Sequence, residues 1–125
     1  MTAPLSDLQR ALDLLSTLAP HRVRGKVVGQ GTEERVVYEF CVGDHPQLET
    51  AWGGTLDATL DAMRRELGLQ CFHAVASKPI TSGLYVKGQA TGMVKATGDT
   101  LLIARARATA QWYQNKLDEL AAKNG

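Results

Sequence analysis

A short segment of this 125-residue chain occurs twice, 45 positions apart, each time where a strand-like run gives way to a helix-like one. The first copy reads Ala-Trp-Gly-Gly-Thr-Leu over residues 51–56, and the second reads Ala-Thr-Gly-Asp-Thr-Leu over residues 96–101. Ala, Gly, Thr and Leu agree at the same places. Because the predicted elements around the two copies also follow the same order, we interpret them as a duplication of one supersecondary unit.

Apolar residues spaced three and four apart predict three helices, over residues 6–19, from 55 to 67, and from 99 or 100 to 123. Ser6 and Gln9 form a capping box at the start of the first helix, and Pro20 ends it. Thr55 is a typical N-cap for the second helix, and Gly68 stands where a C-terminal glycine belongs. The apolar stripe predicted for the last helix consists of Leu102, Ala106, Ala110, Tyr113, Leu117 and Leu120.

Runs rich in Val, Tyr, Phe and alternating residues predict strands over residues 23–29, 35–42, 48–52, 70–77, 83–91 and 93–97. We therefore predict an α+β fold with two pseudo-symmetric βββα halves, residues 21–68 and 69–125, and an extra N-terminal helix within residues 1–20. Mixed or antiparallel strands would lie on one side, with the two main helices packed on the sheet. Residues 21–125 would form one regulatory-type domain.

The amino-acid composition and net charge argue against two classes of binding partner, nucleic acids and membranes. Hydrophobic residues make up 44% and charged residues 22%, as in ordinary globular proteins. With 14 Lys and Arg against 13 Asp and Glu, the net charge of +1 argues against a nucleic-acid backbone binder. No apolar run reaches the roughly 20 residues of a membrane span, and residues 1–4 lack the pattern of a signal peptide. We expect neither nucleic acid nor membrane as a partner.

The cysteines Cys41 and Cys71 lie 30 positions apart without a neighbouring pair of metal ligands. We predict that both are free and buried, which is typical of a reducing cytoplasm. No cofactor or metal site is predicted. If residues 71–76 form a strand, His73 lies on the same face as Cys71, and this pair is the one hint of a nucleophilic thiol.

The two glycine-containing corners are the predicted ligand site. Unpaired N–H groups and the helix dipole make a helix N-terminus attractive to a carboxylate, and glycine permits a close approach. An alternative is that these glycines only shape the corner. Leu56 and Leu101 would add apolar contact. The predicted ligand-binding residues are Gly53, Gly54, Thr55, Leu56, Asp57, Ala58, Gly98, Asp99, Thr100 and Leu101.

The first corner resembles that of the C-terminal regulatory domain of 2-isopropylmalate synthases and related citramalate synthases. The family reads Gly-x-Gly-Pro-Val/Ile-Asp-Ala where residues 52–58 read Trp-Gly-Gly-Thr-Leu-Asp-Ala, so that Trp52 and Thr55 depart from its pattern. The Gly-Asp-Thr-Leu run at 98–101, followed by an alanine-rich segment, is similar to the family's second corner. The resemblance covers residues 21–121.

The resemblance implies a non-catalytic module that senses a branched-chain amino acid such as leucine, forms a homodimer and acts on a separate biosynthetic enzyme. The catalytic barrel of those synthases needs roughly 250 residues and is absent from a chain of this length. We therefore lean towards a protein without catalytic activity, a regulatory domain of leucine biosynthesis.

Two other interpretations stay open. Residues 52–54, Asp61 and the run at 98–101 also resemble parts of hotdog-fold acyl-CoA thioesterases, although Trp52 replaces their histidine and residues 101–110 would have to form a strand. The third interpretation is a structural α/β sandwich, of a type found in phages, that binds no ligand.

Overall fold

The first helix, α1 (Asp7–Leu18), begins at the predicted N-cap. In the computed structural model, which describes residues 6–76, 78–89 and 92–124, Ser6 Oγ accepts a hydrogen bond of 3.1 Å from Gln9 N. This bond satisfies one of the N–H groups that a helix leaves unpaired at its start. The buried face of α1 consists of Ala11, Leu12 and Leu15. Both the cap and the apolar face confirm the prediction.

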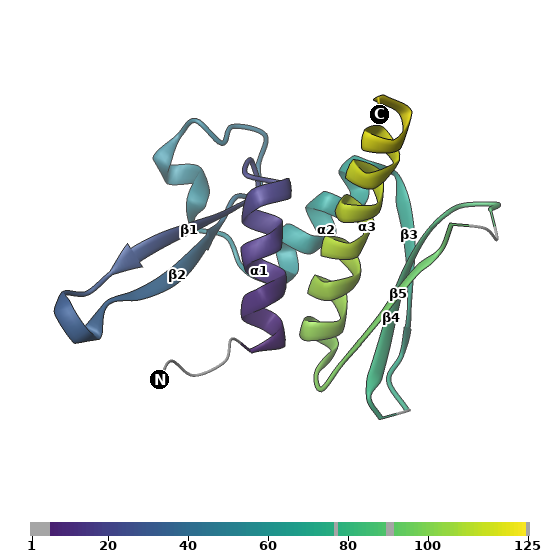
Figure 1. Ribbon diagram of the computed structural model, residues 1–125, viewed down its shortest axis with the longest axis horizontal. Helices are drawn as coiled ribbons and strands as arrows, with labels where there is room; N and C mark the ends of the chain where they lie inside the picture. The colour runs from purple at the N-terminus through teal and green to yellow at the C-terminus, as the bar shows by residue number, and fades with distance from the viewer. Residues whose placement is uncertain (1–5, 77, 90–91, 125) are drawn as a thin grey trace.

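A projecting hairpin follows α1. Strands β1 (Val23–Val28) and β2 (Arg35–Phe40) pair antiparallel, and the short 3-10 helix η1 (Gly31–Glu33) lies in the turn between them. In Figure 1 the tip of this hairpin extends away from the helices. The two predicted strands are therefore confirmed, although β2 ends at residue 40 instead of 42.

The predicted third strand of the first half is wrong. Residues 49–52 form a 3-10 helix, η2 (Glu49–Trp52), because its side chains find partners outside any strand ladder. The indole N–H of Trp52 donates to the carbonyl of Pro46 at 2.7 Å, and the guanidinium of Arg24 lies 4.3 Å from the centre of the Trp52 ring. Within residues 48–53, all of which the structure describes, the one strand-like contact is a parallel bridge from Gly53, just after the predicted strand, to Phe40. The first half thus has two strands where three were predicted.

The second half is an antiparallel meander of three strands, β3 (Leu69–Ala74), β4 (Ile80–Val86) and β5 (Val94–Gly98), with β4 in the centre. The strand predicted over 83–91 is displaced, since β4 begins at residue 80 and ends at residue 86. A turn with Gly88 at a φ of +82° follows it, a conformation that favours glycine. Residues 77, 90 and 91 of the predicted strands lie outside the described residues.

Helices α2 (Leu56–Leu67) and α3 (Leu101–Asn124) confirm the other two predicted helices. Gly68 ends α2 in the left-handed conformation, with a φ of +70°. Residues 101–110, which the thioesterase interpretation requires as a strand, belong to α3. The α+β class with an N-terminal helix is therefore confirmed.

The helices lie between the two sheets (Figure 1). Helix α3 packs against α1 on one side and against β4 and β5 on the other, whereas β1 of the hairpin packs on α1. No helix in the described part of the chain has the length and apolar character of a membrane span.

Helix α3 is buried from two sides, so it has a second apolar face besides the predicted stripe. The first part of that stripe, Leu102 to Tyr113, packs on one core as predicted. Ala106 and Ala110 belong to the core shared with α1 and α2, whereas Ala108 and Trp112 belong to the core shared with the three-stranded sheet. Positions two apart on a helix point in nearly opposite directions, and small alanine side chains let both neighbours approach closely. Beyond this region, the predicted stripe residues Leu117 and Leu120 remain 49% and 57% exposed.

Candidate ligand-binding site

The two predicted corners have the same helix cap, although a 3-10 helix precedes the first and strand β5 precedes the second. Thr55 Oγ1 accepts from Ala58 N, and Thr100 Oγ1 accepts from Ile103 N, each at 3.2 Å. The two threonines, which lie 45 positions apart, are therefore both N-caps. Each accepts a hydrogen bond from a helix N–H group that the predicted site would have used to bind a ligand. The two corners share a capping function.

Steric contact explains a glycine in each corner. A Cβ atom on Gly54 would lie 2.4 Å from Val42 Cγ2, and one on Gly98 would lie 2.8 Å from Ala104 N. Neither glycine has a positive φ among the described residues, so close approach of the chain is their requirement. Gly53 has no atom within 4 Å of such a Cβ and is free of this constraint.

Arg105 joins the starts of α2 and α3. Its Nη1 donates to Asp57 Oδ1 at 2.8 Å, and its Nη2 donates to Asp61 Oδ1 at 2.6 Å. Asp57, one of the predicted ligand residues, is thus paired with a guanidinium of the same chain. Arg107 turns elsewhere and donates to the carbonyl of Thr97, which confirms that these two arginines of α3 point apart.

The remaining predicted site residues differ in exposure. Leu56 is only 8% exposed and is part of the core around α1 and α2. Ala58 and Leu101 are half-buried, whereas Asp99 is exposed. The ten predicted positions thus include caps, a core residue and an ion pair. Whether they also bind a ligand stays a prediction.

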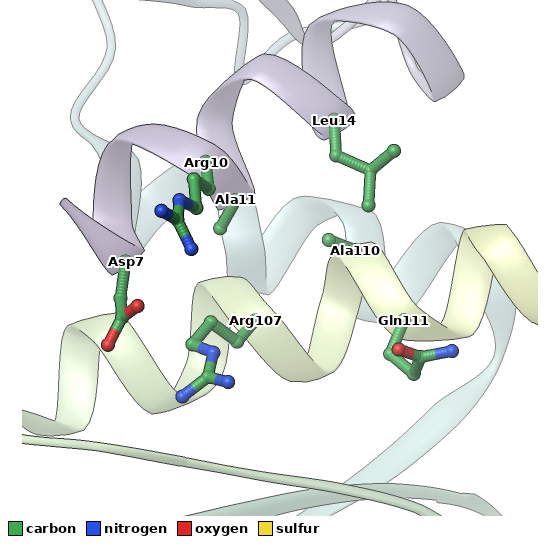
Figure 2. Close-up of a pocket in the computed structure, with 7 residues that line it drawn as sticks. All are labelled: Asp7, Arg10, Ala11, Leu14, Arg107, Ala110 and Gln111. Atoms are coloured by element: carbon green, nitrogen blue, oxygen red, sulfur yellow. The ribbon is translucent and has the colours of Figure 1, made fainter. Parts of the chain in front are cut away.

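A different pocket, one that the sequence did not indicate, lies between α1 and α3. It has a volume of about 210 Å³ and is open to solvent. The residues that line it are Asp7, Arg10, Ala11, Leu14, Arg107, Ala110 and Gln111. Figure 2 shows Asp7, Arg10 and Arg107 gathered at one end, and Leu14 and Ala110 towards the other. The pocket therefore has a charged end and an end where apolar side chains lie beside the amide of Gln111.

The charged end contains two guanidinium groups and one carboxylate. In the described part of the chain, Asp7 and Arg10 form no ion pair, so both remain available to a bound molecule. Arg107 donates from Nη1 to the carbonyl of Thr97, and this bond holds its side chain against the end of β5. This combination suits a molecule that carries one negative and one positive group.

A second hollow of about 430 Å³ adjoins the pocket along β5. It shares Arg107 and Gln111 with the pocket and adds Thr81, Lys95, Ala96 and Thr97. Lys95 brings a further cation to this side of the molecule. Among the described residues, no group of three or more His, Cys, Asp and Glu side chains is placed to hold a metal ion.

No protein-family model matches the chain, and comparison with curated proteins and with solved structures finds no similar one. The likeness to the regulatory domain of 2-isopropylmalate synthases rests on the short corner motifs, and membership of that family stays a prediction.

Proposed function

We propose that the protein is a non-catalytic regulatory module that binds a small aliphatic amino acid in the pocket between α1 and α3. One observation carries the proposal: the pocket places charges of both signs at one end and the apolar side chains of Leu14 and Ala110, next to Gln111, at the other. An amino acid has the same distribution of groups, with two opposite charges at one end and an apolar side chain at the other.

Each part of such a ligand has a partner. A guanidinium can bind a carboxylate through two parallel N–H groups, and Arg10 has no competing ion pair among the described residues. The carboxylate of Asp7 suits the ligand's ammonium group. Ala11, Leu14 and Ala110 offer apolar contact to an aliphatic side chain, which favours leucine, isoleucine or valine. A volume of about 210 Å³ lies below the roughly 300–1,000 Å³ of drug-sized sites and suits a smaller ligand.

The location of the pocket also suits regulation. A ligand there would touch α1 and α3 at once, and α3 packs in turn on the three-stranded sheet. Binding would therefore favour conformations in which α1 is seated on α3, and any partner that distinguishes these conformations would respond to the ligand. The resemblance to the synthase regulatory domain supports a homodimer that controls a separate biosynthetic enzyme in the cytoplasm.

The thioesterase interpretation gains no support from the fold. Residues 101–110 are helical, the three-stranded sheet ends at Gly98, and Asp61, its proposed carboxylate, is paired with Arg105. The ligand-free sandwich predicts that no amino acid binds, and the experiment below tests this.

The test is isothermal titration and thermal shift with the twenty amino acids. We expect an aliphatic amino acid to stabilise the protein, by about 2.7 kcal/mol at 100 times its dissociation constant. Leucinamide, which lacks the carboxylate, and N-acetylleucine, which lacks the ammonium group, should bind at least tenfold more weakly than leucine. This pair of analogues tests the two charges of the site separately.

Variants then locate the site. Arg10→Gln and Asp7→Asn should abolish the stabilisation, whereas Arg35→Gln, on the exposed start of β2, should preserve it. If no amino acid binds, the proposal is wrong and the ligand-free sandwich is favoured. If binding survives the Arg10 and Asp7 variants but is lost in Thr100→Ala, the ligand occupies the corners instead.

A further inference from the structure

Three side chains on neighbouring strands have the arrangement of an activated thiol. Cys71 and His73 lie on the same face of β3, with Cys71 Sγ 4.0 Å from His73 Nε2. On the other side of the imidazole, His73 Nδ1 lies 3.2 Å from the hydroxyl oxygen of Ser82, its direct cross-strand neighbour on β4. The Cys71 thiol, the His73 imidazole and the Ser82 hydroxyl therefore lie side by side as a nucleophile, its base and the group that orients the base.

The Ser82 hydroxyl is suited to orienting the imidazole. Ser82 is only 1% exposed, so its hydroxyl depends on protein groups for hydrogen bonds. When Nδ1 carries the proton and donates to Ser82 Oγ, Nε2 presents its lone pair to the thiol. The ladder between β3 and β4 fixes this relation, because it places residues 73 and 82 opposite each other.

The thiol is also within reach of small molecules. Cys71 is partly exposed, and β3 is an edge strand of its sheet. The other cysteine provides an internal contrast: Cys41 is fully buried, and its thiol lies 3.5 Å from the carbonyl oxygen of Gly43. One cysteine is thus placed beside a base at an edge, and the other is enclosed in the protein.

We propose that Cys71 is a reactive thiol that forms a mixed disulfide by exchange with small-molecule disulfides, with His73 as its base and Ser82 as a positioning residue. The proton of Cys71 passes to His73 Nε2, and the thiolate attacks one sulfur of the disulfide. A new S–S bond to Cys71 forms while the original S–S bond breaks. The departing thiolate takes up the proton from His73, so Cys71 is oxidised and the released half of the disulfide is reduced.

The experiment treats the full chain with glutathione disulfide and follows the adduct by intact mass and peptide mapping. We expect one adduct, at Cys71 and not at Cys41, formed roughly ten times faster at pH 7 than in His73→Gln, because the imidazole can take the thiol proton during the attack and glutamine cannot. Free imidazole should restore much of the rate in His73→Ala. Ser82→Ala should slow the reaction, and Ser82→Thr, which keeps the hydroxyl, should retain more of the rate.

His45→Asn is the matched control, because it removes an exposed histidine from the loop before η2 and should leave the rate unchanged. Thermal unfolding of each variant separates lost reactivity from lost structure, and the imidazole rescue is itself a readout that a structural role would not produce. Equal modification of both cysteines, or an unchanged rate in His73→Gln with no rescue of His73→Ala, would overturn the proposal. Neither result bears on amino-acid binding.

Discussion

Arg105 and Asp61 connect the two helices that follow the repeated corners, with 2.6 Å between Nη2 and Oδ1. The Arg105 side chain is only 14% exposed and also binds Asp57, whereas the carboxylates are 47% and 68% exposed. The ion pair is therefore sheltered on the arginine side and hydrated on the carboxylate side. Its guanidinium holds two successive turns of α2 against α3.

We expect Arg105→Leu to lower the free energy of unfolding by about 1–2 kcal/mol, because the variant leaves two neighbouring carboxylates without their shared cation. Asp61→Asn should cost less, since Asp57 still pairs with Arg105. Chemical denaturation of both variants and of the double variant gives the coupling energy, for which we expect about 0.5–1.5 kcal/mol. A coupling near zero would show that the contact contributes nothing to stability.

Arg22 connects the segment that follows β2 to α2, where its Nε donates to Glu66 Oε2 at 3.4 Å. It is 5% exposed, and its Nη1 donates to the carbonyls of Cys41, Val42 and Gly43 at 3.2, 2.7 and 2.9 Å. Arg22→Lys should destabilise the protein by about 2–4 kcal/mol, because a single ammonium group cannot bond the three carbonyls and the Glu66 carboxylate at once in a buried position. Arg65→Lys on the exposed side of α2 is the control and should be neutral in the same denaturation experiment.

Glu66 makes the stability depend on pH. Burial raises the pKa of Glu66, but the hydrogen bond from His21 and the charges of Arg22 and His21 outweigh it, so the pKa lies below its ordinary value of 4.5. A carboxyl whose pKa is lowered by folding stabilises the protein above its unfolded value and loses this effect as the pH falls through the folded value. Because its side chain is 42% exposed, we expect only a few tenths of a kcal/mol.

The measurement is the free energy of unfolding between pH 3 and pH 7. The loss of stability below about pH 4.5 should be smaller in Glu66→Gln than in the unchanged protein. Glu33→Gln, at the exposed turn of the hairpin, should leave the pH dependence as it is. Identical curves for the Glu66 variant and the unchanged protein would contradict the prediction.

Both repeated threonines are caps, and their removal should have similar effects. Thr55→Ala and Thr100→Ala should each lower the free energy of unfolding by about 1 kcal/mol, because each leaves a helix N–H group without its partner. The serine variants keep the oxygen and should lose only a few tenths. A large loss from one threonine and none from the other would mean that the two corners are not equivalent.

Local signals in the sequence were sufficient to predict the three helices. Ser6, Thr55 and Gly68 act on residues within one turn, so their effects can be predicted without knowing the fold. The strand predicted over 48–52 failed because its conformation depends on Arg24, which is distant in sequence and stacks on Trp52. Long-range contacts of this kind leave no periodic pattern.

The pocket was missed for the same reason. Arg10 and Arg107 come from opposite ends of the chain, and only the packing of α1 on α3 brings them together. The alanines of α3 gave no sign of this packing. Residues as small as Ala106 and Ala110 are compatible both with a helix that is buried on one face and with a helix that is buried on two. The repeated motif predicted a site at the two corners instead, where the threonines act as helix caps.

Substituting the corner glycines tests whether close packing or backbone freedom requires glycine at these positions. Gly98→Ala should lower the free energy of unfolding by about 1–3 kcal/mol, because the added methyl group would press on the backbone at Ala104. Gly53→Ala is the matched control: it adds the same methyl group at a φ of −97° with no atom within 4 Å, and it should be neutral or slightly stabilising. Equal losses in both variants would show that backbone freedom, and not close packing, requires glycine here. If Gly98→Ala is tolerated, the contact of this corner with α3 is looser than the structure shows.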